Sequence, residues 1–188
     1  EESTLAKLEN EFKQNGGKWE EFRIGDLFEL FELKKLNPLD TREFRVKEQD
    51  ESHPIPAVVA KVGDNGIMYY VGKDDFETTK NKLVVIGDGA VASGLVYYQG
   101  QEFTILHNAY AIMLKMPTFE TRQNYLFLAC ALQKAIFDFF GYENKPTWNK
   151  VKECKIKLPT LKNGQIAFEF MEQWIRELEA ERIRELEA

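Results

Sequence analysis

The stretch "ENKPTWNKVKECKIKLPTLKNGQIAFEFMEQWIRELEA" (143–180) places four kinds of segment in a fixed order. A polar loop containing aromatic residues leads into a lysine-rich run at 151–158, whose alternation has the period of a strand. Pro159 is expected to end this strand, because proline has no N–H to donate to a ladder. Asn163-Gly164 predicts a turn, and the apolar spacing from Phe168 predicts a long helix. The order predicts a globular domain that ends in a projecting helix.

Upstream, short apolar runs between turn signals predict a domain rich in strands. We expect strands at 21–24, 55–62, 67–71, 82–86, 94–98, 103–106 and 109–114, a helical turn near Gly25-Asp26 and a long loop at 37–52. Helices are expected at 3–13 and at 121–140, where apolar residues share one broad face. The prediction is an α+β fold of short mixed strands with one packed helix. Its three parts are an N-terminal helix or linker (1–18), a globular domain (19–160) and a long C-terminal helix (161–188).

Composition and charge exclude few classes of protein. The chain has 188 residues, is 44% hydrophobic and carries a net charge of −6, which suits one domain with an appendage and a real core. The body, 19–160, has 18 basic and 20 acidic residues, so it is nearly neutral and could present a basic face locally. No apolar run approaches the ~20 residues that span a bilayer. The two cysteines, Cys130 and Cys154, suit a reducing cytoplasm, and no structural disulfide is expected.

Each motif that resembles a catalytic or ligand-binding site lacks a part that its chemistry requires. "GDGAVASG" at Gly87 resembles a phosphate loop, but it leads into a strand-like run and not into a helix. His53 and His107 are far apart and lack metal-ligand spacing. Asp26 with "ELK" at Glu32 lacks the second acid of a metal-dependent nuclease. We therefore expect a protein with no catalytic residues, no metal and no cofactor.

Polar and aromatic side chains instead gather on the expected loops. Lysine binds phosphates, and Asn, Gln, Ser and Thr pair with base edges, so these loops are candidates for DNA contact. Ordinary solvated loops are the alternative for each residue alone, and Trp148 could be a core anchor. The candidate DNA-binding residues are Lys73, Thr78, Thr79, Lys80, Asn81, Lys82, Tyr97, Tyr98, Gln99, His107, Asn108, Asn144, Lys145, Thr147 and Asn149.

The C-terminal helix has two interpretations. "IRELEA" occurs at Ile175 and again at Ile183, and an offset of eight residues turns the apolar stripe by about 80°, so no clean heptad results. The helix either packs on its own domain or needs a partner helix. The residues expected at such a partner interface are Met171, Trp174, Ile175 and Leu178.

Three segments together resemble the specificity subunit of type I restriction-modification systems. They are "KWEEFRIGDLFEL" at Lys18, "NKPTWNKVKECKIKLP" at Asn144 and "GQIAFEFMEQWIRELEAERIRELEA" at Gly164, and "GDGAVASGLVYY" at Gly87 adds a weaker match. The likeness runs from about Trp19 to the last residue. The chain has Ala167 where relatives usually carry an acidic residue.

The resemblance implies a non-catalytic module that recognises double-stranded DNA. Methyltransferase subunits, which bind S-adenosylmethionine, would dock on it, and the restriction subunit would join indirectly. The helix would set the spacing between two half-sites and could mediate self-association. We expect a cytoplasmic protein without membrane contact, either an excised domain or a half-sized subunit. The alternatives are a recognition domain of a fused restriction–methyltransferase enzyme and a helix-mediated protein-interaction module without a DNA role.

Overall fold

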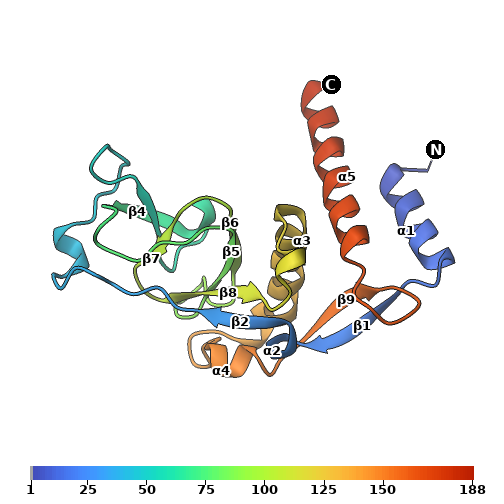
Figure 1. Cartoon of the computed structure of the whole chain (residues 1–188), viewed down its shortest axis with the longest axis horizontal. Coiled ribbons are helices and arrows are strands. Elements are labelled where there is room, and N and C mark those ends of the chain that lie inside the picture. The colour runs from blue at the N-terminus through green and yellow to red at the C-terminus, as the bar shows by residue number, and fades with distance from the viewer. Residues whose placement is uncertain (1) are drawn as a thin grey trace.

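The computed structural model describes residues 2–188 as a strand-rich body from which two helices project side by side (Figure 1). The helices are α1 (Thr4–Gln14), α2 (Ile24–Leu27), α3 (Arg122–Ile136), α4 (Trp148–Val151) and α5 (Phe168–Glu187). The strands are β1 (Lys18–Arg23), β2 (Phe28–Phe31), β3 (Ile55–Val58), β4 (Ile67–Val71), β5 (Lys82–Ile86), β6 (Val96–Gln99), β7 (Thr104–Ile105), β8 (Ala109–Leu114) and β9 (Lys155–Thr160). The mixed α/β class therefore confirms the prediction.

A four-stranded antiparallel sheet, ordered β2-β8-β5-β6, forms the centre of the body. Successive side chains of a strand point to opposite faces. Leu83 and Val85 of β5 accordingly join the main core with α3, while Val84 and Ile86 pack with residues of β3 and the β7 region. Both faces of the sheet are covered, which explains why "KLVVI" is apolar without alternation. The second sheet has the order β4-β3-β7.

A separate two-stranded ladder joins β1 to β9, with Lys18 opposite Thr160 and Arg23 opposite Lys155. Ile156 and Leu158 of β9 are buried in the main core beneath α3. Arg23 closes one end of the ladder: its guanidinium donates to both Glu153 oxygens, at 2.6 and 3.1 Å, and to Asp26 at 2.9 Å. These bonds hold the pKa of Glu153 below its usual value.

The first turns of α5 pack on this chain's own body. Phe168 stacks on Phe119 with ring centroids 4.1 Å apart, and Phe170 stacks on Phe12 of α1 at 4.2 Å. Met171 and Ile175 are buried in the main core, whereas Ile183 and Leu186 beyond them are exposed. The structure thus supports the first interpretation for the base of the helix.

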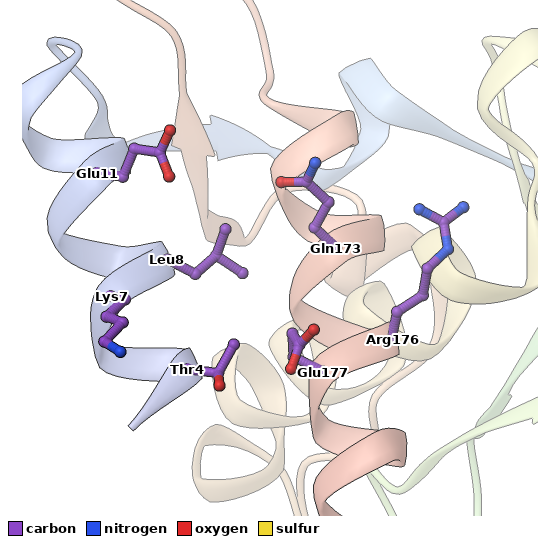
Figure 2. A pocket seen from close by; sticks show the side chains of 7 residues that line it. All are labelled: Thr4, Lys7, Leu8, Glu11, Gln173, Arg176 and Glu177. Atoms are coloured by element: carbon purple, nitrogen blue, oxygen red, sulfur yellow. The ribbon is translucent and has the colours of Figure 1, made fainter. Parts of the chain in front are cut away.

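The two projecting helices run in opposite directions and leave a shallow cleft between them (Figures 1 and 2). The cleft has a volume of ≈ 370 Å³. Leu8 of α1 and Gln173 of α5 border it, and charged residues of both helices surround them (Figure 2).

Several observed boundaries differ from the predicted ones. Strand β9 continues through Pro159, because β9 belongs to a two-stranded ladder with β1 and such an edge strand tolerates proline. Residues 151–154 are not strand: Thr147 precedes the helical turn α4, and Cys154 N donates to Val151 O. Strand β2 was missed, β3 ends at Val58 well short of residue 62, and α3 ends at Ile136 before a 3-10 turn. Both cysteines are free.

A pair of substitutions on α5 tests where the helix packs. Met171→Ala removes a fully buried side chain and should lower the free energy of unfolding by about 2–5 kcal/mol. Ile183→Ala, on the same helix but 54% exposed, should change it by less than about 0.5 kcal/mol. Urea unfolding followed by circular dichroism measures both. Equal effects of the two substitutions would show that α5 does not rest on the body in solution.

Candidate functional site

The candidate DNA-binding residues lie at opposite ends of the central sheet. One group lies where β5 ends and β8 begins, next to α4; we call this the α4 end. The other group lies where β5 begins and β6 ends; we call this the Lys80 end. The five residues of β5 separate them by about 17 Å at 3.4 Å per residue. The structure therefore does not bring the predicted set into one surface.

Three loops meet at the α4 end. The amides of Gly87 and Asp88 donate to Asn108 O at 2.9 and 3.2 Å, which joins the loop after β5 to the turn before β8. Lys145 forms an ion pair with Asp88 at 2.8 Å and adds the loop that leads to α4. The close approach favours glycine at position 87, because a Cβ there would lie 3.1 Å from the Tyr110 ring.

Tyr110 fixes the third loop from below. Its hydroxyl donates to Pro146 O at 2.7 Å, and its ring meets Trp148 edge to face at 6.2 Å. Burial raises the pKa of Tyr110 well above its usual value, so the hydroxyl keeps its proton and remains a donor. Trp148 packs against the main core, which supports the anchor interpretation.

Several polar side chains at the α4 end face solvent. They are His107, Asn108, Asn144, Thr147 and Asn149. Asn108 has a left-handed backbone with φ of 62°, a conformation that asparagine tolerates in tight turns. Amide, hydroxyl and imidazole groups on a rigidly anchored set of loops can form hydrogen bonds with base edges.

The Lys80 end holds its candidate residues in internal bonds. Tyr98 donates to Asn81 Oδ1 at 2.7 Å, and Asn81 Nδ2 donates to Glu120 O at 2.8 Å. The Lys82 side chain is only 12% exposed and lies 5.0 Å from the Phe31 ring centroid and 4.0 Å from Glu120. These bonds connect β5 and β6 to the start of α3.

The neighbouring candidates are also structural. Gln99, which is 3% exposed, donates to Asn65 O at 2.7 Å and accepts from Asn65 Nδ2 at 2.9 Å. Tyr97 donates to Lys61 O at 2.9 Å, and Thr78 donates to Glu102 at 2.7 Å. Thr79 is half-buried and pairs through its backbone with Phe103. Lys80 remains exposed at this end, and Lys73, in the loop after β4, is exposed as well.

Apart from Lys145, a basic run beside the α4 end was not among the predicted site residues. Residues 145–157 contain five lysines and one acid, Glu153, whose charge is paired with Arg23. Lys150 is exposed on α4 and donates to Asn144 at 2.7 Å, and Lys152 follows it half-buried. The lysine density of this run is visible in the sequence, but its alternation was interpreted only as a strand and not as a charged surface.

The residues of α5 expected to contact a partner helix fall into a buried pair and a more exposed pair. Met171 and Ile175 are buried against this chain's own α3, so neither is free to meet a partner helix in this structure. Trp174 is half-buried and Leu178 is 42% exposed. A partner interface on α5 stays a prediction, restricted to Leu178 and the exposed residues beyond it.

Across residues 2–188, no three His, Cys, Asp or Glu side chains come together in a way that could hold a metal ion. No helix in the described part of the chain is long and apolar enough to cross a membrane.

Comparison with known proteins identifies a family and a related solved structure. Residues 16–188 match the family model described as "Type I restriction modification DNA specificity domain". The crystal structure of a type I restriction-modification system S subunit from M. genitalium superposes with a TM-score of 0.58 at 18% identity. The alignment covers 92% of this chain and 41% of that one, so this chain spans less than half of the related subunit. No curated protein matches the sequence significantly.

The Tyr110 bond yields a test of loop anchoring. Tyr110→Phe removes the donor to Pro146 and should cost about 1 kcal/mol of stability while the ring stays in place. Amide hydrogen exchange in residues 142–147 should become faster. Tyr98→Phe is the matched control, because its hydroxyl bonds at the Lys80 end. Faster exchange of residues 142–147 in both variants would mean that Tyr110 does not hold this loop specifically.

Proposed function

The chain belongs to the type I restriction modification DNA specificity domain family, and from this premise we propose that it recognises one half of a split target in double-stranded DNA. The match over 16–188 is the single observation that carries the proposal. The geometry of the α4 end supports it, because exposed hydrogen-bonding side chains lie there beside Lys145, Lys150 and Lys152.

Within this proposal the two kinds of residue have different tasks. Lys145, Lys150 and Lys152 bind phosphates and fix the register of the domain on the duplex, without reading sequence. Asn108, Thr147 and Asn149 are placed to read base edges, because amides and hydroxyls both donate and accept. The Lys80 end keeps the sheet rigid, and its exposed Lys80 lies at the end of β5 away from α4.

The proposed assembly contains further subunits. The domain performs no covalent chemistry itself; a methyltransferase subunit that binds S-adenosylmethionine modifies the target, and a restriction subunit joins that complex. A second recognition domain binds the other half-site, with α5 as the spacer between them. The related S subunit is more than twice as long as the matched region, which fits an arrangement of two domains.

Phosphate contact is tested by two matched double substitutions. Lys150→Ala with Lys152→Ala should weaken duplex binding at least tenfold for every sequence. It should also reduce the slope of log K against log salt by about 2, because each lost phosphate contact contributes about 0.9. Lys73→Ala with Lys80→Ala removes the same charge outside the loops of the α4 end and should change neither quantity. Fluorescence anisotropy at several salt concentrations measures both. The reverse pattern would move the interface to the surface that carries Lys73 and Lys80.

Base readout is tested by selection from randomised duplexes with the cognate methyltransferase present. Asn149→Ala should relax the preference at one position, corresponding to a loss of about 1–3 kcal/mol for the preferred base. Non-specific affinity should stay unchanged, because phosphate contacts supply it. Asn163→Ala, in the exposed turn before α5, is the control and should select the wild-type sequence. An unaltered preference with Asn149→Ala would remove this residue from the reading surface.

A further inference from the structure

An open apolar groove lies on the side of the body where α3, α5 and the β1–β9 ladder meet. It encloses ≈ 910 Å³, well above the cleft between α1 and α5, and its walls are mostly apolar. None of the residues proposed above to contact DNA lines it. The groove therefore needs an explanation of its own.

One wall is a complete helical stripe on the outer side of α3. Phe127, Cys130, Ala131, Lys134 and Ala135 line the groove at the spacing i, i+3, i+4, i+7 and i+8. This spacing marks one face of a helix that packs against another element. Three residues of the stripe have small side chains: Cys130, Ala131 and Ala135. They would let a second helix approach closely, at an interaxial distance of about 8–10 Å.

Large exposed aromatic side chains flank the small residues. Trp19 of β1 is 47% exposed and stacks on Phe127 with centroids 6.2 Å apart. Phe139, just after α3, is 73% exposed, and Trp174 and Leu178 of α5 form the facing wall. Contiguous apolar surface of this kind marks interaction sites on soluble proteins, and tryptophan is enriched where binding energy concentrates.

The charges at the rim are mainly positive. Lys134, Lys155 and Lys157 border the groove, and none of them forms an ion pair with a carboxylate of residues 2–188. Of the two acids at the rim, Glu153 is already paired with Arg23. An occupant with acidic flanks would therefore gain complementary charge at the edge of an apolar contact.

We propose that this groove binds an acidic amphipathic helix of a protein partner. The apolar face of that helix lies on Ala131 and Ala135 between the aromatic walls, and its acidic flanks meet the three lysines. This is recognition of a helix in a groove, in which residues at i, i+3, i+4 and i+7 act as anchors. A DNA backbone does not suit the groove, because phosphates pressed against alanine and phenylalanine would lose hydration without hydrogen bonds.

The experiment uses two synthetic 20-residue helical peptides with the same leucine stripe, one flanked by glutamates and one by lysines. Both cysteines of the chain line the groove, so a Cys154→Ser background makes Cys130 a local reporter. The glutamate peptide should slow modification of Cys130 by a maleimide at least tenfold. The lysine peptide should need at least ten times the concentration for the same protection.

Two variants decide whether the groove and its charges are responsible. Ala131→Arg should abolish protection, and Lys134→Glu with Lys155→Glu and Lys157→Glu should reverse the preference between the peptides. Thermal unfolding checks that each variant is folded, and the triple variant changes only charges at the rim. Equal protection by both peptides, or protection by neither, would overturn the proposal.

Two further outcomes would also overturn it. Protection of Cys130 that grows with protein concentration alone would show that a second copy of this chain fills the groove. A triple variant that lost duplex affinity would show a DNA surface. Duplex binding of the wild-type chain is measured in parallel. If the chain binds DNA but neither peptide, the groove proposal fails and the proposed DNA recognition stands.

Discussion

The antiparallel pairing of β1 with β9 is the constraint on which the rest of the structure depends. It joins residues as far apart in sequence as Lys18 and Thr160, 142 positions apart, and so closes the chain around the central sheet. Closing so long a loop costs conformational entropy. The buried Ile156 and Leu158 and the Arg23–Glu153 pair offset that cost, together with the bonds of the ladder.

The direction of this ladder determines where function can lie. Because β1 and β9 are antiparallel, the chain enters and leaves at the same end, and α1 and α5 project from it together (Figure 1). Strand β9 begins just after α4, at the other end, where the lysine run and the exposed amides lie. Six residues of strand, about 20 Å long, therefore separate the proposed reading surface from the base of the helix. A connection of this kind fixes the base of α5 relative to the proposed reading surface.

Local sequence signals correctly predicted the strands that are apolar along their whole length. Strands β5 and β8 have the predicted bounds, because both are apolar runs limited by turns. Prediction failed where a tertiary partner decides the outcome. Pro159 is accommodated by an edge position that exists only once β9 has paired with β1. Met171 and Ile175 look the same in sequence whether they face their own α3 or a partner helix, and only the folded chain distinguishes the two.

In the candidate site, too, tertiary contacts decide what the sequence alone could not predict. Asn81 and Asn108 have the same side chain and both have a left-handed backbone, yet Asn81 already accepts from Tyr98 and donates to Glu120. An amide whose oxygen and nitrogen are both bonded has little left to offer a base, because each new bond must replace an old one. Asn108 anchors the loops through its backbone oxygen and leaves its side chain exposed to solvent. The capacity to read DNA therefore depends on which polar groups folding leaves unpaired, and residue type alone does not encode that.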